Sequence, residues 1–220
     1  MAKIFTFQRP LSPHYINPSG LNRSKNIMKY FTIIFFIAYP IFNISAHQPA
    51  LNENNTNSPN NAYLIEKPEI SKAIYGTLKG EAHYYIIKSE IDFNFYVGIT
   101  TPKIDGCDTF DKFSVDVINV SNGMEETLLE LDGDNHEWWE WYEPYGKKFY
   151  WIGPEYGAEF KSTNVYESGE YLIRVFNSDN RGKYVLATGD IEKFGPLVIA
   201  KLPLIMPKVN KFWEIENCPS

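Results

Sequence analysis

Residues 131 to 144 read LDGDNHEWWEWYEP and hold the densest group of aromatic and acidic side chains in the chain. Flat indole rings beside carboxylates suit the apolar faces and hydroxyl groups of a sugar, or a cationic group held by cation–π contact. Exposed aromatic side chains usually cover something, so such a loop either packs on the body or forms a binding platform. The candidate ligand-binding residues are Trp138, Trp139, Trp141, Tyr142, Glu137 and Glu140.

The same segment comes close to a catalytic motif without completing it. His136–Glu140 reads HEWWE, in which a glutamate replaces the second histidine of the HExxH zinc motif. Two neighbouring glutamates, Glu137 and Glu140, could serve a hydrolase of cell-surface polysaccharide or peptidoglycan, but that chemistry depends on their separation in space. We therefore expect no catalytic residues, and the hydrolase remains the alternative.

Calcium is the better ionic candidate, because hard oxygen ligands grouped on loops are what this cation takes. The candidate aspartates fall in two stretches, residues 105–111 and 132–134, and neither stretch has the full EF-hand spacing. Aspartates of this kind also form turns. No nucleophile elbow, P-loop or dinucleotide fingerprint occurs, so we expect no bound cofactor. The calcium candidates are Asp105, Asp108, Asp111, Asp132 and Asp134.

The chain has two cysteines, Cys107 and Cys218. In an oxidising compartment an even pair can close one disulfide, which would tie the C-terminal tail to the body. The alternative is two unrelated thiols, and the sequence leaves both open.

The elements that must position these residues follow a period of two. Five runs are rich in aromatic and β-branched side chains and are separated by Gly, Asn, Asp and Ser: His83–Lys88, Asp92–Ile99, Lys112–Val120, Glu170–Phe176 and Lys183–Thr188. Weaker runs are Ala73–Leu78, Thr127–Leu131 and Phe149–Ile152. The alternation predicts an all-β fold, an antiparallel β-sandwich.

The segment 28–46 has the pattern of a secretory signal peptide or membrane anchor. Its apolar run, Tyr30–Ile44, is shorter than the roughly 18 apolar residues of a spanning helix, and Pro40 would break a helix near its end. Cleavage after Ala46 and retention as an N-terminal anchor helix both remain open.

The remaining boundaries follow from composition. Residues 1–27 lack periodicity and are expected to be disordered, and Met28 offers an alternative start. Residues 47–61 are rich in Asn and are expected to be a flexible linker. The β-sandwich domain is predicted over residues 62–190.

Charge agrees with export. Residues 1–46 carry five of the 21 basic residues and none of the 27 acidic ones, which leaves 16 basic against 27 acidic residues beyond them. This asymmetry predicts that the body crosses the membrane and works in the periplasm or at the cell surface. So acidic a body argues against nucleic acid as a partner.

Residues 191–220 form an apolar tail punctuated by prolines. Pro196 can open a helix at its first position, and Pro203 and Pro207 should end it soon after, giving a short helical segment. The tail either packs over one end of the body or lies on a membrane or partner. The residues that suit the second role are Leu202, Leu204, Ile205, Met206, Phe212, Trp213, Lys201, Lys208 and Lys211.

About half of the chain, residues 84–189, resembles the pre-peptidase C-terminal type of exported β-sandwich. The likeness rests on Tyr84–Tyr85, on Asp92–Phe93 and on the closing pair GEYLIRV and GKYVL, at 169–175 and 182–186. It implies a jelly-roll-like, non-catalytic accessory domain of exported proteins.

Together these patterns predict an exported, non-enzymatic β-sandwich that acts as a binding or structural module at the cell envelope. Its expected partners are carbohydrate, a membrane surface or an envelope protein. A membrane-apposed subunit of an envelope assembly, using the C-terminal tail, is a further alternative.

Overall fold

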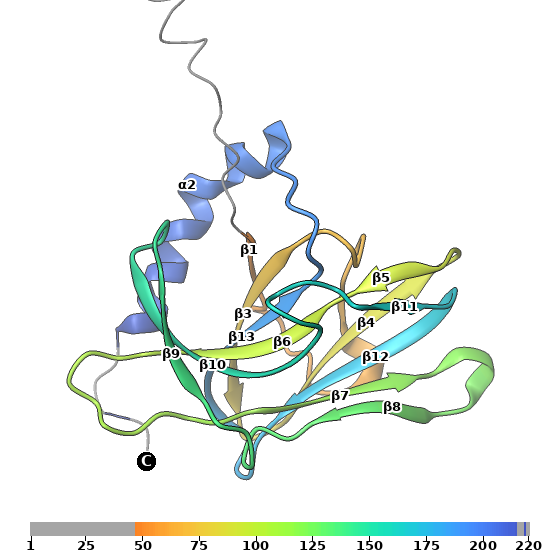
Figure 1. Ribbon diagram of the computed structural model, residues 1–220, viewed down its shortest axis with the longest axis horizontal. Helices are drawn as coiled ribbons and strands as arrows, with labels where there is room; N and C mark the ends of the chain where they lie inside the picture. Colours follow the sequence, from red (N-terminus) through yellow and green to blue (C-terminus); the bar gives the residue numbers. More distant parts are fainter. Residues whose placement is uncertain (1–46, 215–217, 219–220) are drawn as a thin grey trace, which may run out of the picture. The chain divides into compact units, whose positions relative to one another are not determined.

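The structure, a computed structural model, describes residues 47–214 and residue 218. The expected all-β fold is confirmed: two β-sheets face each other across one core, and a C-terminal helix lies outside the strands (Figure 1). The predicted signal or anchor at 28–46 and the extension 1–27 lie outside the described residues. Within the described residues, no helix is long and apolar enough to span a bilayer.

The larger sheet has six strands. In spatial order they are β1 (Gln48–Leu51), β3 (Lys72–Lys79), β13 (Arg181–Thr188), β6 (Val97–Pro102), β10 (Lys148–Tyr156) and β9 (Trp139–Glu143).

The smaller sheet has five strands. Their spatial order is β2 (Tyr63–Leu64), β4 (His83–Ser89), β12 (Gly169–Phe176), β7 (Ser114–Asn119) and β8 (Glu126–Leu131). A separate two-stranded ribbon joins β5 (Phe93–Phe95) to β11 (Asn164–Tyr166), and short 3-10 turns lie at Pro59–Asn61 and Ser121–Gly123.

The sheets are mixed, so the prediction of a purely antiparallel sandwich is wrong. β1 runs parallel to β3, and β2 runs parallel to β4, while the other strand pairs of the two sheets are antiparallel. Both parallel strands come from the N-terminal part of the described chain. That segment runs along the same side of the sandwich and adds a strand to each sheet, where an open edge would otherwise expose unpaired backbone groups.

The flexible linker predicted at 47–61 is also corrected, because this segment is part of the fold. β1 covers the edge of β3, and the backbone N–H of Asn52 donates to the backbone carbonyl of Tyr75 at 2.8 Å. Asn52 and Thr56 are buried. The segment has few large apolar side chains to bury. Backbone pairing and buried side-chain hydrogen bonds instead offset the entropy cost of ordering it.

The core follows the predicted alternation. On β12 the side chains of Tyr171, Ile173 and Val175 point into the core, and each is less than 5% exposed. Arg174 points outward, and its Nε donates to Asp116 Oδ2 at 2.9 Å across the β12–β7 pair. One face of β12 therefore supplies the shared core, and the other carries the Arg174–Asp116 pair.

The run Asp92–Ile99, expected as one strand, is divided at Tyr96 into β5 and β6. β5 pairs with β11, whereas β6 pairs with β10 and β13. The Tyr96 hydroxyl donates to Glu155 at 2.7 Å, which anchors the corner between the two pairings.

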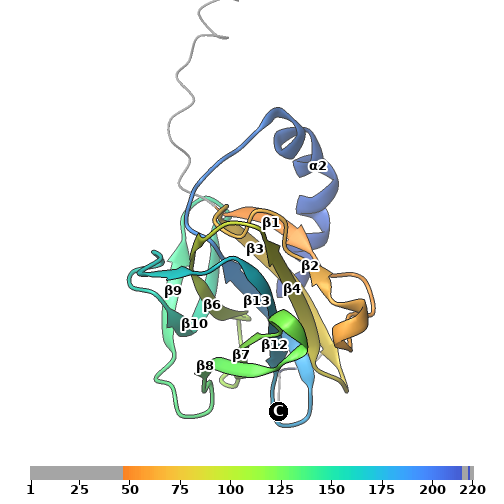
Figure 2. The same cartoon turned by 90° about the vertical axis from the view of Figure 1, so that its right-hand side faces the viewer.

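The C-terminal segment forms helix α2 (Pro196–Asn210) and the 3-10 turn η3 (Lys211–Trp213). They cover the outer face of the six-stranded sheet on the β1 side (Figures 1 and 2). The packed side chains are Val209, Ile205, Met206, Phe212 and Trp213.

The expectation that two prolines would end this helix is wrong. Pro203 and Pro207 lie inside α2, four residues apart, and both are exposed on its solvent side. A proline removes one backbone hydrogen bond and pushes against the preceding turn. On the solvent side the freed carbonyls reach water, so the helix continues while its other face stays packed.

Cys107 and Cys218 form a disulfide that joins positions 111 residues apart, which decides the pairing that the sequence left open. It ties the C-terminal end to the loop between β6 and β7. In the chain-entropy model, closing a loop of this length stabilises the fold by on the order of 4–5 kcal/mol.

Candidate functional site

The tryptophan-rich segment is an edge strand and not the loop that its sequence suggested. β9 is the last strand of the six-stranded sheet and pairs with β10. Its alternation places Trp139 and Trp141 on one face, and Glu140 and Tyr142 on the other. The predicted platform is therefore split between two faces.

Trp138, just before β9, is a packing residue. Its indole Nε1 donates to the Gly133 carbonyl at 2.7 Å, and its ring packs against the main core and lies 5.6 Å from the Phe110 ring. A Cβ on Gly153 would fall within 3 Å of this ring. Trp138 is therefore a half-buried packing residue and not part of an open platform.

Trp141 packs on the outer face of the sheet, where its ring lies 6.1 Å from Tyr150 and 5.6 Å from Phe160. Phe160 belongs to a two-residue turn in which Glu159 and Phe160 both have left-handed backbones, with φ of 52° and 62°. For residues with a Cβ this conformation costs on the order of 1–2 kcal/mol each. Packing of Phe160 against Trp141 and Trp139 offsets that cost.

The side chains that remain open at this edge are Trp139, Tyr142 and Phe149, which are 46%, 44% and 39% exposed. The Tyr142 and Phe149 rings lie 4.8 Å apart across the β9–β10 pair. Tyr142, Phe149 and Glu140 lie on the same face of this strand pair, opposite Trp139, and we call these three side chains the β9–β10 edge.

A lysine and a carboxylate lie beside these rings. Lys103 pairs with Glu140 and lies 5.7 Å from the Phe149 ring and 5.2 Å from the Trp151 ring. Beside Phe149 a hollow of about 530 Å³ opens toward Trp213 and the disulfide.

The glutamates of the hydrolase alternative have separate surroundings. Glu140 is engaged by Lys103, and Glu137 is exposed in the turn before β9. Glu143 accepts the amide of Tyr145 at 2.8 Å and that of Gly146, so it holds the β9–β10 turn.

The calcium candidates do not come together. Among residues 47–214 and 218, no group of three or more His, Cys, Asp or Glu side chains is placed to hold a metal ion. Asp132 caps its own turn by accepting the amides of Asp134 and Asn135, and Asp111 lies against Gly182.

A second hollow was not predicted from the sequence. It is a groove of about 680 Å³ between residues 51–57, the β3–β4 end of the sandwich and the C-terminal end of α2 with η3. Its polar side chains include Asn52, Asn54, Asn55, Thr77 and His83, with Tyr75 and Phe212 as aromatic wall. The asparagine run read as a linker was the one available signal.

A buried hydrogen-bond chain lies under this groove. The Asn52 amide nitrogen donates to Thr56 Oγ1 at 2.8 Å and to the Tyr85 hydroxyl at 3.2 Å. The Tyr85 and Tyr184 hydroxyls lie 2.6 Å apart, and the Tyr184 hydroxyl lies 2.7 Å from His83 Nδ1.

The donors in this chain fix one tautomer of His83. The side-chain nitrogen of Asn52 only donates, and it lies 3.4 Å from His83 Nδ1 as well as 3.2 Å from the Tyr85 hydroxyl. His83 Nδ1 is therefore an acceptor, and the Tyr184 hydroxyl, 2.7 Å away, donates to it. The proton of the neutral imidazole therefore sits on Nε2, the nitrogen left for the groove.

Burial keeps this chain uncharged. It raises the pKa of Tyr85 and Tyr184 above the usual value of 10.0, so both phenols stay protonated. Burial, with a smaller contribution from Lys79, lowers the pKa of His83 below 6.5. The hydrogen-bond chain under the groove is thus uncharged.

Gly76 makes room for this chain. It lies opposite Tyr184 in the β3–β13 pair, and a Cβ at Gly76 would fall closer than 3.0 Å to the Tyr184 ring. We expect Gly76→Ala to lower the free energy of unfolding by about 1–3 kcal/mol, the range for overpacked cores. Urea unfolding measures this change.

The matched control is Gly195→Ala, because nothing lies within 4 Å of the added Cβ at Gly195. Its effect should stay below about 1 kcal/mol, which reflects only the poorer capping of α2 by alanine than by glycine at this N-cap. Equal effects of the two changes would contradict the packing of Tyr184 described above.

The pKa of His83 predicts a pH dependence of stability. Since this pKa is lowered in the fold, the unfolded chain binds more protons below about pH 6.5, and the free energy of unfolding falls as the pH drops below that value. His47, also buried with a lowered pKa, acts in the same direction.

His83→Gln offers an amide oxygen to Tyr184 and does not titrate. The loss of stability between pH 7.5 and 5.5 should therefore be smaller in His83→Gln than in the unmodified protein, as measured by urea unfolding at both pH values. An identical loss in both proteins would show that His83 is not the titrating group.

Comparison with known proteins adds no family assignment: no family model matches the chain, and no curated protein matches its sequence. The residues behind the resemblance to the pre-peptidase C-terminal type have structural places. Tyr85 belongs to β4, and the closing pair forms β12 and β13. The likeness therefore stays a prediction about the kind of β-sandwich.

Proposed function

We propose that this chain is an exported, non-enzymatic binding module of the cell envelope, built as a jelly-roll-like β-sandwich, and that it binds saccharide chains along the β9–β10 edge. The observation that carries this proposal is the exposure of Tyr142 and Phe149 side by side on one face of the β9–β10 pair, next to Glu140, while Trp138 and Trp141 are packed.

The chemistry of the edge fits a polymer of sugar rings. Aromatic rings on neighbouring strands can cover the apolar face of a pyranose, and Glu140 can accept from its hydroxyls. Because β9 is the outermost strand, a long chain could lie along it without entering a closed pocket. Phe149 continues the surface into the hollow beside Trp213.

The disulfide supports export. Disulfides persist in secreted and periplasmic proteins and are rare where glutathione and thioredoxin keep thiols reduced. A link between Cys107 and Cys218 agrees with the leader pattern of residues 28–46.

Binding at the edge can be tested with insoluble peptidoglycan and a co-sedimentation assay on the full chain. Tyr142→Ala and Phe149→Ala should each weaken binding by about three- to tenfold, since an aromatic contact contributes about 0.5–1.5 kcal/mol beyond its buried area. The control is Tyr84→Ala, on β4 of the opposite sheet.

Thermal unfolding of the three variants guards against a folding defect. Loss of binding in Tyr84→Ala equal to that in the edge variants, or no sedimentation of the unmodified protein, would refute the edge as a saccharide site.

Export can be tested by fractionating cells that express the full chain and labelling free thiols. We expect the protein in the envelope or periplasmic fraction with both cysteines protected from alkylation until a reductant is added. Recovery from the cytosol with both thiols reactive would overturn the export proposal, whatever the outcome of the binding assay.

A further inference from the structure

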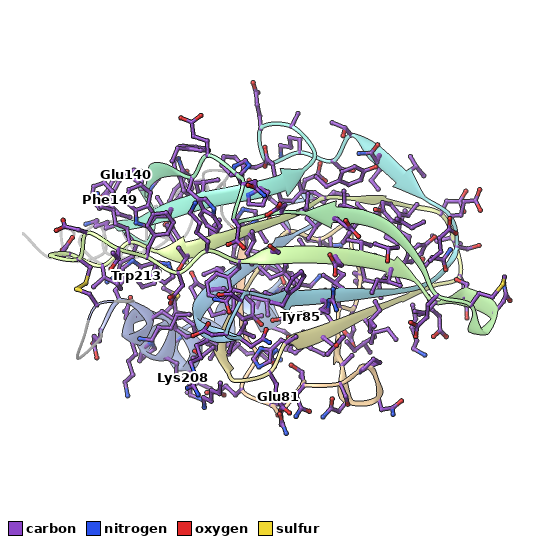
Figure 3. The ribbon with its side chains drawn as sticks, turned by 90° about the horizontal axis from the view of Figure 1, so that it is seen from below. Glu81, Tyr85, Glu140, Phe149, Lys208 and Trp213 are labelled. Atoms are coloured by element: carbon purple, nitrogen blue, oxygen red, sulfur yellow. A yellow bond between two sulfur atoms is a disulfide. The ribbon has the colours of Figure 1, made fainter. Side chains whose placement is uncertain are left out.

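The groove over the buried hydrogen-bond chain is separate from the β9–β10 edge. Figure 3 shows Glu140 and Phe149 at one side of the molecule, and Glu81 and Lys208, which border the groove, at the opposite side. We propose that this groove is a second binding site, for a small hydroxylated carboxylate of about the size of a hexuronic acid.

The charges at the groove favour an anion. Lys208 is paired with Glu53 at 2.8 Å, and Glu81 accepts a hydrogen bond from Asn57. Lys79 and Lys211 also line the groove, and within the described chain neither ammonium group has an ion pair or a hydrogen bond. One carboxylate between these two lysines would balance the charge of the groove.

The floor supplies donors for such a ligand. His83 is 8% exposed and lines the groove, and its Nδ1 is occupied by Tyr184, which leaves Nε2–H for an oxygen of the ligand. The neutral imidazole can donate there without adding a further charge.

Asn52 gives a second, independent sign that this end of the protein is built for polar contacts. It is 7% exposed and lines the groove, yet its carbonyl oxygen has no hydrogen-bond partner in the described structure. A buried polar atom without a partner costs free energy, typically about 1–3 kcal/mol. This oxygen is closed to solvent, so a turn of the Asn52 side chain toward a ligand hydroxyl in the groove would recover part of that cost.

Size and walls also fit. A volume of about 680 Å³ is within the range of small-molecule pockets, which span roughly 300–1,000 Å³. Tyr75 and Phe212, whose rings lie 5.1 Å apart, provide an aromatic wall for the apolar face of a ring-shaped ligand. The amides of Asn54 and Asn55 lie at the rim for its hydroxyls.

The test is isothermal titration calorimetry of the full chain with three probes. Glucuronate carries the hydroxyls and the carboxylate, glucose carries only the hydroxyls, and acetate carries only the charge. Glucuronate should bind at least about tenfold more tightly than glucose or acetate, because a charge-assisted hydrogen bond adds to the neutral ones.

Lys79→Gln and Lys211→Gln should each weaken glucuronate binding by about three- to tenfold, the range for partly exposed charged contacts. Lys201→Gln is the matched control, since Lys201 is exposed on α2 and does not line the groove. All three lysines are exposed, so these variants should fold normally.

A second readout follows His83 directly. Glucuronate should shift the Nε2–H resonance of His83 in ¹⁵N NMR, and glucose should shift it less. No glucuronate binding, equal binding of glucuronate and glucose, or equal effects of Lys79→Gln and Lys201→Gln would overturn the proposal. Tyr142→Ala should bind glucuronate normally, which separates this site from the β9–β10 edge.

Discussion

The side chain of Tyr184 extends across the core from β13 to β4. There its hydroxyl contacts the Tyr85 hydroxyl and the His83 imidazole. A buried hydroxyl is tolerated only with partners, so this contact fixes how the two sheets face each other. The Tyr184 ring leaves no room for a side chain at position 76, which is a glycine. The Asn52 side chain completes the hydrogen bonds by donating to the Tyr85 hydroxyl. Much of the architecture on the β1 side follows from satisfying these few buried polar atoms.

This requirement explains why an asparagine-rich segment is ordered. Asn52 and Thr56 complete the buried chain, and β1 closes the open edge of β3. The same segment then forms one wall of the groove, facing α2 and η3. The groove therefore exists only because this segment is ordered.

The opposite edge is organised by aromatic packing. Trp138 is held by Gly133 and Phe110, and Trp141 by Tyr150 and the strained Phe160 turn. These fixed rings leave Trp139 free at the surface. The disulfide and the packing of Trp213 on Tyr75 and Tyr150 close the remaining face of the larger sheet.

The sequence by itself determined the strands with clear alternation, such as β12 and β7, because burying one face of a sheet imposes a period of two on those residues. It also marked the tail as helical and the two cysteines as a candidate pair. The tertiary structure alone decided the order of residues 47–61, the strand character of β9 and the groove. In each case the stabilising contacts come from residues distant in the chain: Asn52 needs Tyr85, β9 needs β10 and Phe160, and the groove needs three separate segments. The local sequence does not show which distant residues a segment will contact. Polar and tryptophan-rich segments are therefore predicted as loops, although contacts with distant residues order them.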